Sequence, residues 1–440
     1  MSRVEIKKNR LISDWRLAGA VVFLLLAWGC GGRETSGQEG GLGAYGRTAE
    51  TYPRISGTDL GRNGRAEVKN VILCIGDGMG VGQVAITRLR TVGADGRLYI
   101  ERMPVAGIMR THSADSLVTD SAAAATAMAC GVKTKKGTVG MDAEGRRREN
   151  ILEAAKAKGM RTGIVVTSSI TNATPACFAS HVSSRKMEEQ IAEQLLDNRV
   201  NVMFGGGWKF FLPFITGGGV RTDGRDLIKE AKEGGYYYLD TADKLESAEG
   251  EYVLGLFAAG SLTTREPEPS LGELTEKAIK FLSKEEGEGE QGSGFFLMVE
   301  GSKIDRACHE NNEEECVRQV LLFDEAVKAG IDFAMSKGRT LVVVTADHET
   351  GGLVITGEEG GSSKPEVKWS SKGHTAMPVA VYAFGPGAEE FSGVYDNTEI
   401  AKKTARLLGI DDFAIVKQAW ESKDREAEIF SRLYLTGVSK

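Results

Sequence analysis

Short apolar runs that are rich in β-branched residues recur along this chain, and most of them end in glycine or polar residues. The runs cover residues 71–75, 163–167, 200–207, 295–301, 341–345 and 379–385. Continuous runs of this kind fit strands that are buried on both faces, as in a parallel sheet. Helical patterns lie between them, at residues 151–159, 187–198, 274–284, 316–335 and 398–409. This alternation predicts an α/β fold with a doubly wound, mostly parallel central sheet flanked by helices.

Length and charge narrow the class of protein further. A chain of 440 residues with mixed charge can bury a large core, so this is a globular protein rather than a disordered one. The formal net charge is −6, and the sequence has no basic stripe with interleaved aromatic residues. A nucleic-acid partner is therefore not expected. We assign residues 67–440 to a single domain.

Residues 1–30 have the features of an export signal. Basic residues precede an apolar run at residues 18–29, which is too short for an ordinary membrane span of about 20 residues. The run ends in LAWGC, which resembles a bacterial lipoprotein box with Cys30 as the lipidated residue, although bulky Trp28 stands where a small residue is usual. Simple cleavage and an uncleaved anchor are the alternatives.

We therefore expect an exported protein, periplasmic or at the cell surface, with a lipid anchor at Cys30. It would meet the membrane only through this N-terminal segment. Residues 31–66 are rich in glycine and polar residues and have no apolar period, so they are expected to form a flexible tether.

Polar residues closely follow several of the predicted strands. Asp77 comes after the first strand, Glu300 lies at the end of the fourth, and Asp347 and His348 follow the fifth. In open α/β sheets, ligands bind outside the carboxyl ends of the strands. Residues that are far apart in the sequence should therefore meet at one edge of the sheet.

Two segments are expected to be surface loops. Residues 284–294 are acidic and imply no chemistry. Residues 357–373 are rich in glycine, serine and lysine, and this loop would bring His374 to the edge of the sheet.

Three aspartates and three histidines form a set that can hold two zinc ions. The set consists of Asp77, Asp305, His309, Asp347, His348 and His374. Asp305 and His309 are four positions apart, which puts both side chains on one side of a helical turn. Judged singly, such an aspartate is often only a helix cap, and such a histidine only a surface or core residue. The whole set, with three of the chain's five histidines, favours a metal site.

Ser121 opens the alanine-rich segment SAAAATAMA, which strongly favours helix. Asp120 or Ser121 can simply cap that helix. However, the start of a helix also presents unpaired N–H groups and the positive end of a dipole, which suit a phosphate group. A serine there is better placed to attack phosphorus if zinc also coordinates it.

Six segments of the chain resemble the alkaline phosphatase family and occur in that family's order. They are VILCIGDGMG (71–80), VTDSAAAATAMACGVKT (118–134), TNATPACFASHVSSRK (171–186), VEGSKIDRACHE (299–310), TADHETGG (345–352) and GHT (373–375). VTDSAAAATA and TADHETGG are highly specific, the others moderately so. The resemblance spans roughly residues 68–385 and implies the fold of that family and a homodimer.

The resemblance also implies a reaction, the metal-dependent hydrolysis of phosphate monoesters with release of inorganic phosphate and an alcohol. Ser121 would be the nucleophile and would form a phosphoserine. The implied ligands are Asp305, His309 and His374 for a first zinc ion, and Asp77, Asp347 and His348 for a second. The first ion would activate the water that cleaves the phosphoserine, and the second would lower the pKa of the serine.

A third site, usually magnesium, is implied at Asp77, Thr174 and Glu300. Arg185 would clamp two phosphate oxygens through its planar fork. The chain departs from many relatives at Asn172, where they carry aspartate or histidine near the third metal. Because an asparagine is neutral, we expect weaker magnesium retention here than an aspartate would give.

Several other residues allow two interpretations. Arg306 can face the phosphate through water or be a solvated charge, and Trp208 can line the site or, as we favour, pack in the interior. His112 and His181 match no ligand position and are expected to be hydrogen-bonded structural residues.

The cysteines imply little chemistry. Cys74 lies in an apolar run and is expected to be a small core residue. Cys308 and Cys316 are close enough in the sequence to form a disulfide in an oxidising compartment, or to remain free.

Two other functions compete with phosphomonoester hydrolysis. A phosphodiesterase or sulfatase can use the same metal-bearing fold, but Arg185 favours monoesters because its fork is best matched by two free non-bridging oxygens with full charge. A tethered lipoprotein that only binds phosphate or metal has no use for a nucleophile such as Ser121.

Overall fold

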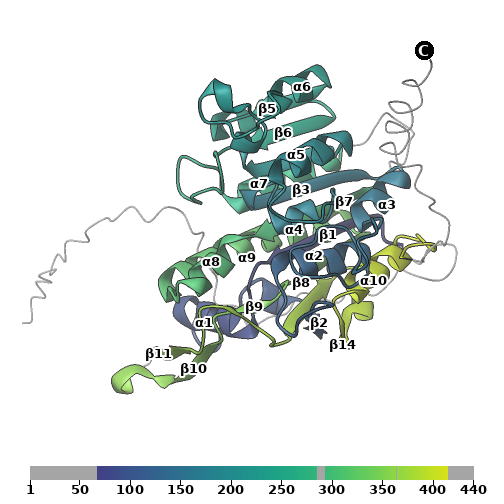
Figure 1. Cartoon of the computed structure of the whole chain (residues 1–440). Helices are drawn as coiled ribbons and strands as arrows, with labels where there is room; N and C mark the ends of the chain where they lie inside the picture. The colour runs from purple at the N-terminus through teal and green to yellow at the C-terminus, as the bar shows by residue number, and fades with distance from the viewer. Residues whose placement is uncertain (1–66, 285–292, 363, 415–440) are drawn as a thin grey trace, which may run out of the picture. The chain divides into compact units, whose positions relative to one another are not determined.

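The computed structural model describes residues 67–284, 293–362 and 364–414, and a ten-stranded sheet runs through this part of the chain (Figure 1). From one edge to the other, the strands are β14 (Gly393–Asp396), β2 (Val105–Arg110), β13 (Val379–Phe384), β8 (Thr340–Thr345), β1 (Asn70–Gly76), β7 (Phe295–Gly301), β3 (Arg161–Ser169), β4 (Val202–Gly206), β6 (Tyr252–Leu256) and β5 (Tyr236–Leu239). Every predicted apolar run is a strand of this sheet. Strands β2, β5, β6 and β14 were not predicted.

The sheet is mostly parallel, as expected. Strands β8, β1, β7, β3, β4, β6 and β5 all run in the same direction. The strand at residues 379–385 is the exception to the prediction, because β13 pairs antiparallel with both β8 and β2. Its side chains alternate partly between buried and half-buried, whereas those of β1, β7 and β8 are all buried.

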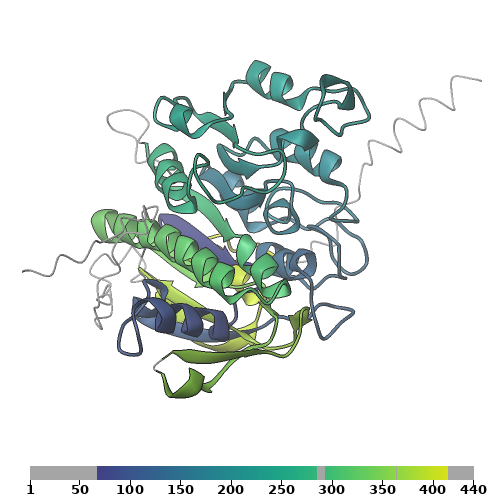
Figure 2. The ribbon, with the colours of Figure 1, turned by 90° about the vertical axis from the view of Figure 1, so that its left-hand side faces the viewer.

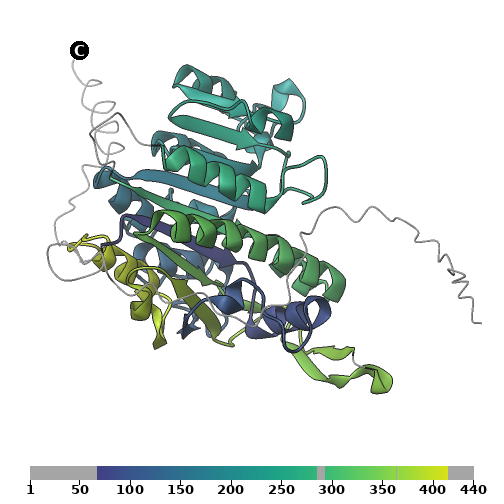
Figure 3. The same ribbon diagram turned by 180° about the vertical axis from the view of Figure 1, so that it is seen from behind.

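Helices cover both faces of the sheet, so the fold is doubly wound. One face carries α1 (Val81–Thr91), α7 (Leu271–Leu282) and α9 (Glu313–Lys337), and α9 packs against both of the others (Figures 2 and 3). The other face carries α2 (Ser121–Cys130), α3 (Ile151–Ala157), α4 (Ala173–Ala176) and α10 (Glu399–Leu407) (Figure 1). The remaining helices are α5 (Glu188–Asp197), α6 (Leu227–Glu233) and α8 (Lys303–His309). The predicted helices correspond to α3, α5, α7, α9 and α10.

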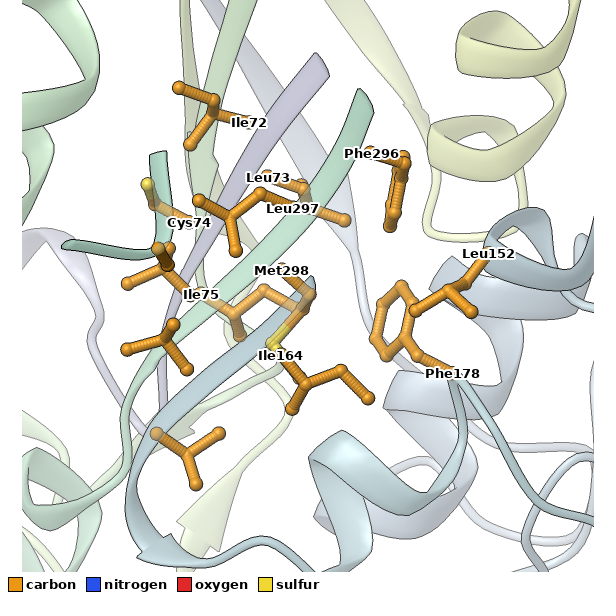
Figure 4. Packing of buried hydrophobic residues seen from close by; sticks show 14 of the residues in the cluster. Ile72, Leu73, Cys74, Ile75, Leu152, Ile164, Phe178, Phe296, Leu297 and Met298 are labelled. Atoms are coloured by element: carbon orange, nitrogen blue, oxygen red, sulfur yellow. The ribbon is translucent and has the colours of Figure 1, made fainter. Parts of the chain in front are cut away.

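The core lies between the sheet and these helices. The side chains of β1 and β7 interleave with residues from α3, β3 and the segment after α4 (Figure 4). Phe178 and Phe296 stack there with their ring centroids 6.2 Å apart. Cys74 of β1 is also fully buried, which confirms its assignment as a small core residue, and burial raises the pKa of its thiol to about 12.

The segment at residues 357–373 is not the simple loop that we predicted. Strands β10 (Leu353–Glu358) and β11 (Pro365–Trp369) form an antiparallel hairpin that extends away from the main sheet (Figure 1). Next to it, β9 (Glu349–Thr350) pairs with β12 (His374–Thr375), with His374 opposite Thr350. The hairpin thus returns the chain to the sheet edge at a fixed register. Of the predicted acidic loop, residues 285–292 lie outside the described part.

The export signal, Cys30 and the tether at residues 31–66 also lie outside the described residues. Within the described residues, no helix is long and apolar enough to cross a bilayer. Cys308 and Cys316 are both buried free thiols, with their sulfur atoms 3.7 Å apart, so the possible disulfide is not formed.

Candidate active site

The carboxyl ends of β8, β1, β7 and β3 lie side by side, and the predicted site residues follow them. Gly76 at the end of β1 is opposite Gly301 of β7, and Ile75 is opposite Thr345 of β8. Asp77 and the bend at residues 346–348 therefore begin at the same edge of the sheet, as expected from parallel strands. Glu300 is the penultimate residue of β7 and is fully buried.

Helix α8 begins directly after β7 and carries Asp305 and His309 one turn apart, as the spacing predicted. His309 Nε2 lies 3.2 Å from Asp305 Oδ2 and 3.2 Å from His374 Nε2. The Nδ1 atoms of the two histidines face backbone carbonyls, that of Lys372 at 2.5 Å and that of Thr119 at 2.9 Å. Each Nδ1 therefore carries a proton, and both Nε2 atoms turn toward Asp305.

Such an arrangement of Asp305, His309 and His374 can hold a cation. The hydrogen bond to Asp305 raises the pKa of His309 to about 9. One donor atom from each of the three residues lies within 4.8 Å of the others. Two imidazoles and a carboxylate are a ligand set that zinc accepts.

A second set of ligands surrounds His348, which is fully buried. Its Nε2 atom lies 3.2 Å from Asp347 Oδ2 and 3.6 Å from Asp77 Oδ1. Donor atoms of Asp77, Asp305 and His348 also lie within 4.8 Å of one another, so Asp305 stands between the two sets. The ring of His348 stacks on that of His374 at a centroid distance of 3.6 Å, which brings the two sets together.

Buried oxygens without partners show that this site fits cations. Asp77 Oδ1, Asp347 Oδ2, Glu300 Oε1 and Thr174 Oγ1 are buried and have no hydrogen-bond partner. Burial, and then the charges of Asp347 and Asp305, raise the pKa of Asp77 well above its ordinary value. Burial likewise raises the pKa of Glu300 to about 7. Bound divalent cations would satisfy these oxygens and compensate the gathered negative charge.

Ser121 is the first residue of α2 and lies against the second set, with its Oγ atom 3.4 Å from His348 Nε2. Asp120 is the N-cap, since its carboxylate accepts a hydrogen bond from the Ala123 amide at 3.1 Å. Ser121 is thus free of the capping role that the sequence left open for it. All ten residues of α2 are buried, and its many alanines allow this close packing.

A cavity of about 300 Å³ opens onto these residues. Its lining includes Asp77, Ser121, Asp305, His309, His374 and Arg185. The guanidinium of Arg185 is held from two sides, by Asp120 at 3.4 Å and by the side-chain oxygen of Asn172 at 3.3 Å. Asn172 also caps α4, because the same oxygen accepts the Ala173 amide at 2.7 Å.

Some residues of the site were not predicted from the sequence. Thr350 donates a hydrogen bond to Asp305 Oδ1 at 2.5 Å. Ser302 donates one to Glu300 Oε2 at 2.6 Å, and Ser168 lies 3.4 Å from the same oxygen. Ser302 and Thr350 stand in the motifs VEGSK and TADHETGG beside predicted ligands, and that position is the only sequence signal that they carry.

The structure also places the other polar and aromatic residues that were considered from the sequence. Arg306 lines the cavity but is 77% exposed and forms an ion pair with Glu310 at 3.3 Å. Trp208 packs against the core, as favoured. His181 is a structural residue, bonded to the Gly140 carbonyl at 2.7 Å and to Glu153 at 2.9 Å.

His112 was expected to be a hydrogen-bonded structural residue, and for its side chain this expectation is wrong. The ring is 45% exposed, and Nδ1 lies 3.8 Å from Asp396, which is too far for a hydrogen bond. Its backbone carbonyl accepts a bond from Lys133 instead.

Comparison with known proteins gives one consistent family. A sequence model of the alkaline phosphatase family matches residues 68–366 and 359–410. Alkaline phosphatase 3 of Bacillus subtilis is 35% identical, over 81% of this chain and 93% of its own length. The alkaline phosphatase of the Antarctic bacterium TAB5 superposes with a TM-score of 0.71 at 34% identity, over 78% of this chain and 98% of that one. A variant of that enzyme with Mg bound in the M3 site gives 0.70 at 35% identity, over the same shares. The chain therefore belongs to the alkaline phosphatase family.

Proposed function

We propose that this hydrolase cleaves phosphate monoesters through a phosphoserine formed on Ser121, with two zinc ions and one magnesium ion as cofactors. Family membership supports the monoester reaction. The observation that carries the finer proposal is the position of Ser121, whose hydroxyl lies at the N-terminus of α2 and 3.4 Å from a histidine among unpartnered carboxylate oxygens. A protein that only binds phosphate has no need of this hydroxyl.

Two ligand sets would hold the zinc ions. Asp305, His309 and His374 form the first set, and Asp77, Asp347 and His348 form the second. Two divalent cations at these positions would stabilise the entering and departing oxygens of an in-line displacement and lower the pKa of the serine hydroxyl.

The chain's own groups act on the phosphoryl group. The Ser121 hydroxyl loses its proton and its oxygen forms a bond to phosphorus, while the bond from phosphorus to the alcohol oxygen breaks and that oxygen takes up a proton. Backbone amides at the start of α2 and the guanidinium of Arg185 hold the non-bridging oxygens. Water then loses a proton and attacks phosphorus, the bond to the serine oxygen breaks, and that oxygen takes up a proton, which releases phosphate and regenerates the hydroxyl of Ser121.

Arg185 is expected to make the enzyme prefer monoesters. A monoester dianion offers the fork non-bridging oxygens that share about two negative charges, whereas the two free oxygens of a diester share only one. We expect a higher kcat/KM for a phenyl monoester than for its diester. We also expect Arg185→Lys to lower the monoester value by about 10- to 100-fold, since it loses charge-assisted hydrogen bonds.

Steady-state kinetics with both esters measures this preference, and Arg147→Lys is the control, since Arg147 is exposed and does not line the cavity. A preference of the wild-type enzyme for the diester would contradict the proposed function. An unchanged monoester value in Arg185→Lys would remove Arg185 from phosphate binding.

We place the magnesium ion at Asp77, Thr174 and Glu300, all of which have an unpartnered buried oxygen. Magnesium binding at the M3 site of the TAB5 variant supports a third metal in such a fold. The side-chain oxygen of Asn172 is not free to coordinate the ion, because it accepts hydrogen bonds from Arg185 and from the Ala173 amide.

Asn172→Asp should therefore strengthen magnesium retention. A carboxylate can keep both present bonds with one oxygen and offer the other to the ion or to its waters. We expect the variant to hold magnesium at least about tenfold more tightly, as a change of this kind in the surroundings of a metal often gives. Magnesium titration followed by metal analysis measures this, with Asn172→Gln as the control that adds no charge. Equal retention in the wild type and Asn172→Asp would show that the expectation is wrong.

We further propose that the protein is exported, that it is lipid-anchored at Cys30, and that it forms a homodimer. The LAWGC segment supports the anchor, and the family resemblance supports the dimer. The mass of the mature N-terminus tests the first two points, and analytical ultracentrifugation tests the third.

A further inference from the structure

The hydroxyl of Thr350 lies between the two ligand sets. Its Oγ1 atom is 2.5 Å from Asp305 Oδ1 and 3.2 Å from His348 Nδ1. Asp305 belongs to the first set and His348 to the second. Thr350 is fully buried, and its backbone is fixed by the pairing of β9 with β12 opposite His374.

The direction of these two hydrogen bonds follows from proton counting. A carboxylate only accepts, so the single hydroxyl proton of Thr350 goes to Asp305. The hydroxyl oxygen can then only accept from His348, whose Nδ1 must carry a proton. Because Nδ1 keeps its proton, the ring atom of His348 that can bind a cation is Nε2, which faces Ser121, Asp347 and Asp77.

We infer that Thr350 is a positioning residue whose one hydroxyl orients a ligand in each of the two zinc sites. Building on the proposed function, this inference assigns the tautomer of His348 and the rotamer of Asp305 to the same group. Histidines that bind metals usually donate their other N–H to a carboxylate, carbonyl or water, and this outer contact tunes affinity. Here a threonine fills that place and links it to the neighbouring site.

We call the pair of hydrogen bonds that joins Asp305 and His348 through Thr350 the bridge. Gly78 leaves the space that this bridge needs. A Cβ atom on Gly78 would lie 2.8 Å from Thr350 Oγ1 and 2.9 Å from Asp305 Oδ1, and its φ of 70° also favours glycine. The Gly78 carbonyl accepts the Thr350 amide at 3.1 Å, and the Gly78 amide donates to Asp347 Oδ1 at 3.0 Å. The turn after β1 thus closes over the bridge with its backbone alone.

Two substitutions separate a hydrogen-bonding role from packing. Thr350→Val keeps the shape of the side chain but removes the hydroxyl, and Thr350→Ser keeps the hydroxyl but removes the methyl group. If Thr350 acted through packing alone, valine would be the better substitute. If Thr350 acts through the hydrogen bonds of its hydroxyl, serine is the better substitute.

Zinc affinity of the full chain, measured by competition with a coloured chelator, is the first test. Thr350→Val should weaken both zinc equivalents by about 10- to 100-fold, while Thr350→Ser stays within about threefold of the wild type. The inference is overturned if valine leaves either equivalent unchanged, or if serine weakens both as much as valine does. A wild-type protein that binds fewer than two zinc ions would instead contradict the proposed function.

A second measurement needs no variant and no metal. Long-range ¹H–¹⁵N NMR spectra of the metal-free wild type report which ring nitrogen of His348 carries the proton. We expect a proton on Nδ1, and this signature should be retained in Thr350→Ser and lost or mixed in Thr350→Val. A wild-type ring with a proton on Nε2 and none on Nδ1 would overturn the inference even if both zinc ions bind.

Discussion

Ser121→Ala is expected to lower kcat for phosphate monoesters by at least about 10³-fold, because no other hydroxyl takes the place of the nucleophile. Phosphate binding should persist, since Arg185 and the α2 amides remain in the cavity. Steady-state kinetics and calorimetric titration with inorganic phosphate measure the two effects separately.

An exposed serine supplies the control for this experiment. Ser247→Ala removes a hydroxyl that bonds to the Lys244 carbonyl and does not line the cavity, so its turnover should equal that of the wild type. Acid-stable ³²P labelling of the wild type with inorganic phosphate, absent in Ser121→Ala, would identify the phosphoserine. If Ser121→Ala kept kcat within tenfold of the wild type, the phosphoserine route would have to be abandoned.

Metal removal is the second change with a large expected effect. Chelation should abolish turnover and lower the unfolding temperature, because it leaves Asp77, Asp347 and Glu300 buried with unpartnered oxygens. Zinc together with magnesium should restore both properties. Activity and thermal unfolding, each with metal content determined on the same sample, test this. Full turnover in a sample shown to be free of metal would contradict a metal-dependent mechanism.

The metal-free protein should also become less stable as pH rises. Burial raises the pKa of Glu300 from 4.5 to about 7, so the folded protein holds this proton more tightly than the unfolded chain does. That stabilisation is complete below the unfolded pKa and is lost as pH rises through the folded one. Between about pH 5 and pH 8, the unfolding temperature of the metal-free wild type should fall more steeply than that of metal-free Glu300→Gln.

Much of the fold could be predicted because the central strands are buried on both faces. The residues of β1, β7 and β8 are all buried, and such continuous apolar runs stand out in a sequence. The antiparallel direction of β13 could not be predicted in the same way, since an apolar run in a sequence does not show which way its strand runs in the sheet. Strand β2 was missed because it alternates and contains Gly107. The β10–β11 hairpin was missed because the segment at residues 357–364, which joins its strands, is polar and rich in glycine and looks like a loop.

Some residues of the candidate site could likewise be predicted from the sequence and others could not. Charged and imidazole groups such as Asp305 and His309 could be assigned from their spacing, because few residue types suit a zinc site. Thr350 could not, since a threonine in a sequence has no feature that separates a structural hydroxyl from one that bridges two ligands. The role of Asn172 also needed coordinates, because only they show that its oxygen is occupied by Arg185.

The neighbouring strands β1 and β7 come from distant parts of the chain, and Asn70 bonds to Phe295 across 225 positions. His374 arrives later still, on the return from the β10–β11 hairpin. Closing such long loops is slow and comes after local structure. During synthesis, a growing polypeptide therefore lacks the complete set of proposed ligands until residue 374 has been added. Under the proposed function, the full set of ions can be bound only after nearly all of the described chain has been made and its distant strands have paired.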